Sequence, residues 1–328
     1  MDIKNVYYLP SGRIFVVDVG DYLIECTEMR DVSVHGKEHL AVRETLDPHV
    51  IWNHLVSYED KWLLTVSTQM GCEISCRFCD VAKLPFKGNL TSQQIEDQIR
   101  ILLSNTNYVN KSKKVKIGFA RMGEPAFNLD NVIDVIKRLP VISADMGKDF
   151  NWLPCFNSIL PRKLQRGITG FDVMREVIKV KEENYNGFLH FQISCNSTDE
   201  DTRKHLFGGA DVLSIPEIIG FINQVKITNR TITLNFIVMD NIEVDVNKLK
   251  DIGLNKDKFT VKLIPLNNTV NAQENSLTPY ANYSNYEKLI ALGDKFNDIG
   301  IPTVIDAIAK CEESSLCCGQ LAQIYINS

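Results

Sequence analysis

The chain has 328 residues, of which 44% are hydrophobic and 23% are charged, and its formal net charge is −5. This is the composition of an ordinary globular protein, and no apolar run is long enough to cross a bilayer. The acidic balance gives no global basic surface for nucleic acid, and the first residues lack the order of a signal peptide, so we expect a cytoplasmic protein without membrane contact.

Residues 1–60 alternate apolar and polar residues, as in RIFVVDVGDYLIECTEM, which predicts a small N-terminal β-rich segment. The core is expected over residues 61–328, where strand and helix patterns alternate. The predicted strands are 62–70, 115–122, 152–159, 188–195, 231–239 and 259–266. The predicted helices are 91–103 with Thr91 as N-cap, 128–139 closed by Pro140, 170–180, 199–206, 215–225 and 285–300, with a short helix before the last strand.

Six strand-then-helix units of this kind predict an α/β fold with a parallel sheet wrapped by helices. At this length we expect a partial (βα)6 barrel rather than an open doubly wound sheet. The loops after the strand carboxyl ends form the active face of a barrel. The first of these loops is rich in cysteine, so we expect the chemistry there.

That loop contains Cys72, Cys76 and Cys79 at C-x3-C-x2-C spacing. Thiolates bind zinc and iron–sulfur clusters, but a closed zinc site takes four protein ligands and no second C-x2-C or H-x3-H follows. Three thiolates on a [4Fe–4S] cluster leave one iron open to a small molecule, and Phe78 would shield one side of the cluster. A chance spacing or a partial zinc knuckle is the alternative.

This cysteine spacing, with an aromatic residue before the last cysteine and a place after the first barrel strand, resembles the signature of radical S-adenosylmethionine (SAM) enzymes. The remaining motifs resemble the RlmN and Cfr family of adenine methyltransferases of ribosomal and transfer RNA. In order from residue 67 to 321 they are S-x-Q-x-G before the first cysteine, FKGNLT, MGEPAFNLDNV, FQISCNSTDEDTRKHL, LIPLN and CGQL.

The resemblance implies a [4Fe–4S] cluster on the three cysteines and SAM bound at its open iron. Gly123 and Glu124 match the segment that binds the SAM amino group. The strand-end positions that match further SAM contacts are Ser158, which matches loosely, Ser194, Asn196 and Asn267. From the residues alone, Glu124 could instead cap the next helix, and the others could be simple turn formers.

Cys318 matches the cysteine that the family first methylates with one SAM, a polar transfer that needs a thiolate. In the family, a radical from a second SAM then abstracts hydrogen from the S-methyl group, and the carbon adds to adenine. The resemblance therefore implies RNA, either tRNA or rRNA, as the acceptor and an electron donor such as flavodoxin or ferredoxin. We expect a monomer. The alternative for Cys318 is a small buried hydrophobic residue.

The chain departs from the family at several positions. Thr65 stands where the family has a second cysteine, and Trp52 or a neighbour stands where it has a glutamate base. Glu59 and Asp60 could replace the base. The thiols that could replace the second cysteine are Cys195, Cys311 and Cys317, the last being least suitable because a vicinal disulfide with Cys318 is strained. The β-rich segment stands in place of the family's helical N-terminal extension.

Two other hypotheses remain open at this level. One keeps the cluster and SAM but has a nucleotide, peptide or small metabolite as the acceptor, with altered chemistry. The other is a non-catalytic RNA-binding module stabilised by zinc or by a cluster. Iron and sulfide content separates the second of these from the enzymes.

Overall fold

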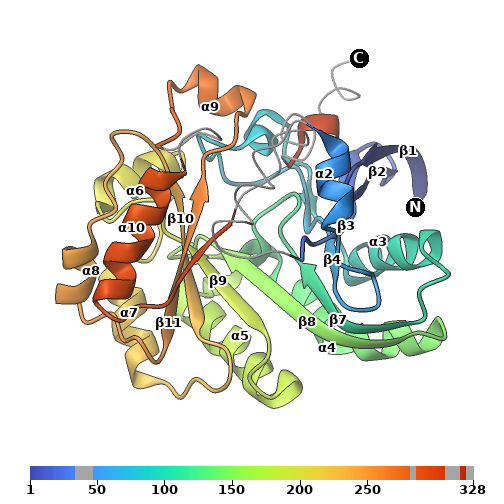
Figure 1. The fold of residues 1–328 in the computed structure, drawn as a ribbon. Helices are drawn as coiled ribbons and strands as arrows, with labels where there is room; N and C mark the ends of the chain where they lie inside the picture. Colours follow the sequence, from blue (N-terminus) through green and yellow to red (C-terminus); the bar gives the residue numbers. More distant parts are fainter. Residues whose placement is uncertain (34–46, 281–285, 307–317, 323–328) are drawn as a thin grey trace. The chain divides into compact units, whose positions relative to one another are not determined.

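The computed structural model describes residues 1–33, 47–280, 286–306 and 318–322 (Figure 1). The chain divides into two compact units. Unit 1 comprises residues 1–73, 80–156 and 309–328, and unit 2 comprises residues 74–79 and 157–308. Each unit has parallel strands and helices.

The sheet of unit 1 combines antiparallel and parallel strands. Its strands are β1 (Asp2–Leu9), β2 (Gly12–Asp18), β3 (Leu23–Arg30), β4 (Trp62–Thr65), β7 (Lys111–Gly118) and β8 (Asp149–Ser158), whose last two residues belong to unit 2. Pairing is antiparallel from β1 to β4 and parallel from β4 through β7 to β8. The predicted N-terminal β-rich segment thus extends the sheet through β3. Whether residue 60 is a domain boundary stays a prediction.

The helices of unit 1 are α2 (Pro48–Asn53), the 3₁₀ turn η1 (Asp80–Lys83), α3 (Ser92–Asn105), the 3₁₀ turn η2 (Pro125–Asn128) and α4 (Leu129–Asp145). Helix α3 begins with the expected N-cap, since Thr91 and Gln94 form a capping box. The side chain of Gln98 on α3 accepts from the backbone N–H of Ser67 and donates to its carbonyl, at 2.8 and 3.0 Å. This fixes the chain just after β4.

The prediction that Pro140 ends the second helix is wrong, because α4 continues to Asp145. A proline inside a helix removes one backbone hydrogen bond and crowds the preceding turn. Here tertiary packing outweighs that cost. Ile142 and Ser143 are buried beyond the proline, and Trp152 Nε1 donates to Ser143 Oγ at 3.1 Å.

Unit 2 carries four parallel strands, β9 (His190–Ser194), β10 (Ile232–Val238), β11 (Phe259–Pro265) and β12 (Thr303–Ile305). Its helices are α5 (Gly170–Tyr185), α6 (Glu200–Leu206), α7 (Ile215–Gln224), α8 (Val246–Asp251), α9 (Val270–Glu274) and α10 (Glu287–Asp298), with a 3₁₀ turn η3 (Gln165–Gly167). The sequence did not predict β12 or α9, because each is too short to show a period.

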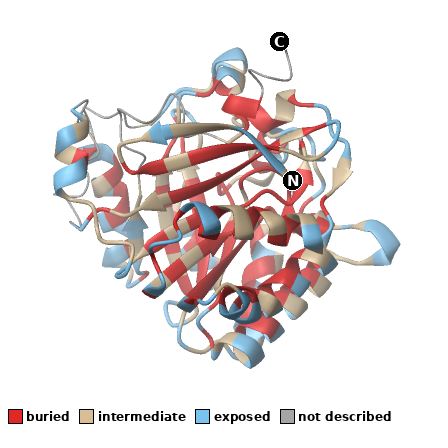
Figure 2. Cartoon of the chain, turned by 90° about the vertical axis from the view of Figure 1, so that its right-hand side faces the viewer, coloured by how far each residue is buried: buried red, intermediate tan, exposed pale blue. Residues whose placement is uncertain are grey.

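Buried residues run along the strands, while exposed ones gather on loops and on the outer sides of helices (Figure 2). Strand β10 is buried along almost its whole length, as expected of a strand covered on both faces, whereas β4 and β11 alternate buried and half-buried residues. The predicted α/β class with parallel strands is confirmed. In the part of the chain that the structure describes, no helix has both the length and the hydropathy needed to span a membrane.

Candidate active site

The loop that leads to the first cysteine is anchored in unit 1 by Gln69. Strand β5 (Gln69–Met70) pairs with β6 (Gly88–Asn89), and Gln69 Nε2 donates to Asn89 Oδ1 at 2.7 Å. Gly71 has a φ of +79°, and a Cβ there would lie 2.6 Å from the Pro85 carbonyl oxygen. Only glycine fits this position, so the motif S-x-Q-x-G builds the turn that precedes Cys72.

Gly123 and Glu124 lie against the same glutamine. A Cβ on Gly123 would lie 2.6 Å from Gln69 Cβ, and the Glu124 N–H donates to Gln69 Oε1 at 2.9 Å. The carboxylate of Glu124 accepts from the Ala126 N–H at 3.0 Å and so caps η2. The helix-capping interpretation of Glu124 is therefore realised. Its role toward the SAM amino group stays a prediction.

Cys318 is half-buried and lies in unit 1 beside the residues that follow β7. Its Sγ donates to the carbonyl oxygen of Ala120 and accepts from Arg121 Nη1, both at 3.8 Å. Burial raises the pKa of the Cys318 thiol above its ordinary value, and the positive charge of Arg121 opposes that rise. The candidate methyl carrier thus lies beside the segment after β7 that leads to Gly123 and Glu124.

The segment that carries Cys318 is packed into unit 1 on both sides. Gly319 has a φ of +84°, and a Cβ there would lie 2.7 Å from Val81 Cγ2. Leu321 is buried against Ile14 and Val16 of β2. Burial of one leucine contributes about 1.5–3 kcal/mol, so the motif CGQL supplies its own anchor.

Glu25 on β3 is fully buried and joins this segment to the sheet. Its carboxylate accepts from Arg121 Nε at 2.8 Å and Nη2 at 2.6 Å, and from the N–H groups of Gly319 and Ala322 at 3.1 and 2.8 Å. The sequence analysis missed Glu25 and Arg121. The available signal was an acidic residue within the apolar run YLIECTEM.

Cys76 and Cys79 lie in unit 2, in a loop whose backbone is held from the segment after β11. Asn271 Nδ2 donates to the carbonyl oxygens of Cys76 and Cys79 at 2.8 and 3.1 Å, and Thr269 Oγ1 donates to that of Phe78 at 2.9 Å. A fixed loop that carries thiol ligands fits an iron–sulfur cluster by the chemistry of its donors. No local pattern around Thr269 or Asn271 predicts that these residues anchor the cysteine loop.

The side chain of Phe78 packs within unit 2. It contacts an apolar cluster made by Leu206, Met239, Leu266 and Ala272. It also meets Phe207 edge to face, with ring centroids 6.3 Å apart. The aromatic residue of the motif therefore anchors its loop, and its shielding of a cluster stays a prediction.

Within the described residues, no group of three or more His, Cys, Asp and Glu side chains that could hold a metal ion is present. Cys72 belongs to unit 1, whereas Cys76 and Cys79 belong to unit 2. Ligation of a cluster by the three cysteines therefore stays a prediction.

Asn196 is the most distinctive of the predicted SAM contacts in unit 2. It follows β9 with a φ of +63°, and its Oδ1 accepts from the Ile237 N–H at 3.0 Å. Its Nδ2 is buried and has no hydrogen-bond partner in the described structure. An unpaired buried donor costs about 1–3 kcal/mol, which an acceptor on a bound ligand would offset. Ser194, the last residue of β9, is half-buried.

The other two predicted contacts occupy turn positions. Ser158 Oγ accepts from the N–H of Leu160, a residue with a φ of +55°, at 2.8 Å. The carbonyl oxygen of Asn267 accepts from the Thr269 N–H at 2.9 Å, just before α9. Both residues thus make the contacts of turn formers, and their roles toward SAM stay predictions.

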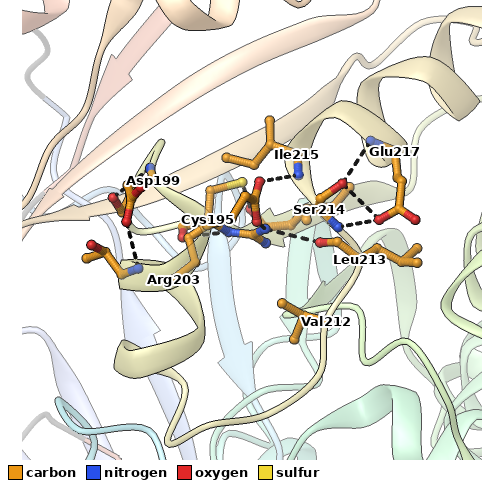
Figure 3. Close-up of polar contacts among 12 residues, drawn as sticks. Cys195, Asp199, Arg203, Val212, Leu213, Ser214, Ile215 and Glu217 are labelled. Atoms are coloured by element: carbon orange, nitrogen blue, oxygen red, sulfur yellow. Dashed lines mark hydrogen bonds and ion pairs between the residues drawn. The ribbon is translucent and has the colours of Figure 1, made fainter.

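Arg203 ties the end of β9 to the two helices that follow it (Figure 3). The side chain is fully buried, and its Nε donates to the Cys195 carbonyl oxygen at 3.1 Å. Its Nη1 donates to the Leu213 carbonyl oxygen at 3.1 Å and to Glu200 Oε2 at 2.6 Å. Glu200 Oε1 in turn accepts from the Ile215 N–H at 2.8 Å. Arg203, in the stretch FQISCNSTDEDTRKHL, therefore supports the strand end that carries Ser194 and Asn196.

We predict that Arg203→Met lowers the free energy of unfolding by about 3 kcal/mol, because it leaves two buried carbonyl groups and a partly buried carboxylate without their donor. Urea unfolding measures this. Arg175→Met is the matched control, since Arg175 pairs with Asp172 at an exposed site on α5, and it should cost less than about 1 kcal/mol. Equal losses in the two variants would contradict the role given to Arg203.

Of the three thiols suggested as replacements for the family's second cysteine, the structure describes one. Cys311 and Cys317 lie outside the described residues. Cys195 is fully buried, and burial raises its pKa to about 12, so its thiol stays protonated at neutral pH and is a poor nucleophile. Thr65 shares a hydrogen bond of 2.5 Å between its hydroxyl and that of Thr27 on β3.

The residues considered as a replacement base lie away from Cys318. Asp60 precedes β4 and pairs with Lys113 at 2.7 Å, near the start of β7. Cys318 instead lies beside the residues that follow the end of β7. Since β4 and β7 are parallel, Asp60 and its neighbour Glu59 are at the opposite end of these strands. Trp52 is exposed on α2.

No family model matches the chain. It is 28% identical over 298 residues to the probable dual-specificity RNA methyltransferase RlmN of Pseudothermotoga lettingae, covering 88% of this chain and 77% of that protein. It is 27% identical over 266 residues to the dual-specificity RNA methyltransferase RlmN of Campylobacter hominis, covering 80% of this chain and 67% of that protein.

The chain spans about half to two thirds of the length of several curated relatives that it matches, such as 61% of the probable RlmN of Aquifex aeolicus and 50% of the RlmN of Sulfurovum sp.. Among solved structures, it resembles a radical SAM methyltransferase from Sphaerobacter thermophilus with a TM-score of 0.66. That match covers 97% of this chain and 80% of the other at 16% identity, which shows a shared fold.

The ordered motifs, the parallel strands and helices, and the relatives of both kinds agree with one another. The chain is therefore similar in sequence to RlmN RNA methyltransferases and shares its fold with a radical SAM methyltransferase, which supports a divergent RlmN-like radical SAM protein.

Proposed function

We propose that this protein is a radical SAM methyltransferase that uses Cys318 as its methyl carrier and an adenine carbon in RNA as its acceptor. The observation that carries the proposal is the seating of the Cys318 thiol beside Arg121, on the strand end that leads into Gly123 and Glu124. The names of the relatives, dual-specificity RNA methyltransferases, support RNA as the acceptor. The proposal includes a cytoplasmic monomer.

Cys72, Cys76 and Cys79 would hold the [4Fe–4S] cluster, which supplies, when bound, the electron for reductive cleavage of SAM. A small electron-transfer protein such as flavodoxin or ferredoxin would provide that electron. Gly123 and Glu124 would bind the amino group of SAM. The strand-end residues that would orient the rest of SAM are Ser158, Ser194, Asn196 and Asn267.

Cys318 has the first chemical task. Its thiol loses a proton, and the thiolate attacks the methyl carbon of SAM. A sulfur–carbon bond forms as the carbon–sulfonium bond breaks, and S-adenosylhomocysteine leaves. The half-buried position of Cys318 limits water around the carrier sulfur.

Mass spectrometry of the C-terminal peptide tests this proposal. We predict that protein reconstituted with iron and sulfide and incubated with SAM bearing a deuterated methyl group carries the label on Cys318. With reductant and tRNA or rRNA fragments added, the label should move to adenine. Cys318→Ala should give neither product. A wild-type Cys318 that is never methylated would contradict the methyl-carrier mechanism.

A second candidate keeps the cluster and SAM but acts on a nucleotide, a peptide or a small metabolite. Thr65 favours it, because a threonine hydroxyl bonded to Thr27 stands where the family has its second cysteine. In the same labelling experiment, label that reaches small molecules or peptides but not RNA would select this candidate.

A further inference from the structure

The ion pair of Arg121 and Glu25 is buried in unit 1, with Arg121 4% exposed and Glu25 fully enclosed. The guanidinium directs two of its nitrogens, Nε and Nη2, to the Glu25 carboxylate. The third nitrogen, Nη1, donates to Cys318 Sγ at 3.8 Å. The planar fork of an arginine can serve two partners in this way, whereas a lysine ammonium is a single point of charge.

We propose that Arg121 stabilises the thiolate of Cys318 for methyl transfer from SAM, and that Glu25 is the positioning residue that fixes both Arg121 and the turn bearing Cys318. This inference rests on the proposed function, because it concerns the residue that accepts the methyl group. It names an electrostatic partner for the carrier sulfur that none of the matched motifs specifies.

The charge balance of the methyl transfer explains the need for Arg121. Before the transfer, the Cys318 thiol gives its proton to water, and the thiolate adds a negative charge beside a neutral ion pair. As the new sulfur–carbon bond forms, the negative charge on sulfur and the positive charge on the SAM sulfonium disappear together. Afterwards Arg121 and Glu25 still neutralise each other, so no unpaired charge remains buried.

The groups around the sulfur determine how readily it ionises. Burial raises the pKa of Cys318, Arg121 lowers it and Glu25 raises it. Further titratable groups near this segment are Cys26, next to Glu25 on β3, and the buried Asp80, whose neighbour Val81 packs against Gly319. Burial raises the pKa of Cys26 as well, so that thiol stays neutral. Of these two charged side chains, Arg121 favours the thiolate and Glu25 opposes it.

The carboxylate of Glu25 holds the turn that bears Cys318 by accepting hydrogen bonds from the backbone of that turn. The N–H groups of Gly319 and Ala322, one and four residues after Cys318, both donate to its carboxylate. The same carboxylate orients Arg121, so one side chain sets the position of both the sulfur and its cation. Hydrogen bonds to a charged acceptor are stronger than those to a neutral one.

The rate of alkylation of Cys318 by iodoacetamide, measured as a function of pH, separates the effect of nearby charges on the thiol pKa from the accessibility of the sulfur to the reagent. The full-length protein is used, without SAM or iron, and tandem mass spectrometry assigns the label to Cys318 rather than to Cys311 or Cys317 in the same peptide. The midpoint of the rate profile reports the pKa of the thiol. The plateau at high pH reports how easily the reagent reaches the sulfur.

We predict that Arg121→Met moves the midpoint upward by about one pH unit and slows alkylation near neutral pH by about tenfold, with a similar plateau. Arg121→Lys should restore most of the wild-type midpoint. The double variant Glu25→Gln with Arg121→Met removes both charges but keeps an acceptor for the turn. It should keep the raised midpoint even if the single Arg121→Met variant folds poorly.

Arg13→Met is the matched control. Arg13 pairs with the fully buried Glu28 at 2.6 Å, between β2 and β3, and donates to Thr106 Oγ1 at 2.7 Å. This variant should lose stability while leaving the Cys318 midpoint unchanged. A midpoint that moves equally in Arg13→Met and Arg121→Met would overturn the proposal.

Two other outcomes also overturn it: an unchanged midpoint in both variants that lack Arg121, and a lowered plateau with an unchanged midpoint, which would mean that the pair only seats the turn. The proposed function fails separately. If wild-type Cys318 is never methylated by SAM, the methyl-carrier mechanism is wrong, while the alkylation profiles still decide whether Arg121 stabilises the thiolate.

Discussion

Cys76→Ala is expected to reduce the iron content of the anaerobically reconstituted protein from about four irons per chain to near zero, with loss of methyl transfer to RNA. Two thiolates cannot hold a [4Fe–4S] cluster that already lacks a fourth protein ligand. Cys76 is the most informative cysteine to substitute. Its carbonyl oxygen accepts a hydrogen bond from Asn271, so the loop backbone should keep its conformation when the thiol is removed. Iron and sulfide analysis with the visible absorption spectrum measures the effect.

Cys195→Ala is the matched control, because Cys195 is a fully buried cysteine outside the motif. It should keep its iron and its spectrum. Retention of iron in Cys76→Ala, or stoichiometric zinc without sulfide in the wild type, would contradict the cluster assignment. The second result would instead support a zinc-stabilised RNA-binding module.

Glu25→Ala should lower the free energy of unfolding by about 3–5 kcal/mol, the cost of breaking a buried ion pair by removing one partner. The variant leaves Arg121 with an uncompensated charge at a site that is 4% exposed, and it also removes the acceptor for the N–H groups of Gly319 and Ala322. Denaturant unfolding followed by circular dichroism measures the loss.

Two further variants test the cause of that loss. Glu25→Gln with Arg121→Met should be less destabilised than Glu25→Ala, because no unpaired charge is left. Asp60→Ala breaks an exposed pair with Lys113 and should cost less than about 1 kcal/mol. A loss in Glu25→Ala as small as that in Asp60→Ala would show that the ion pair is not a main tether of the Cys318 segment.

Local signals predicted much of the fold. The capping box of α3 needs only Thr91 and Gln94, three residues apart, and it occurs as expected. Parallel strands such as β10 could be predicted because they are apolar runs between helical patterns. The error at Pro140 arose because the packing of Ile142, Ser143 and Trp152, which extends α4, depends on tertiary contacts.

The parts of the candidate site that lie within one short motif could be predicted from the sequence. Glycine at positions 71 and 123 is required by close backbone approaches that the motifs encode. The supports of the site were not predictable. Asn271 bonds to Cys76 across 195 residues, and Arg121 approaches Cys318 across 197. Contacts at such separations leave no periodic trace in a single sequence.

The bonds from Glu25 to the N–H groups of Gly319 and Ala322 span 294 and 297 residues. A ribosome therefore makes strands β3, β4 and β7 long before the segment that carries Cys318. The ion pair of Glu25 and Arg121 can form while the chain is still being synthesised, and the last part to arrive docks onto it. A nascent chain consequently lacks Cys318, the proposed methyl acceptor, while strands β3, β4 and β7 are being made. Under the proposed function, methyl transfer can therefore begin only after the strands that seat this segment have been synthesised.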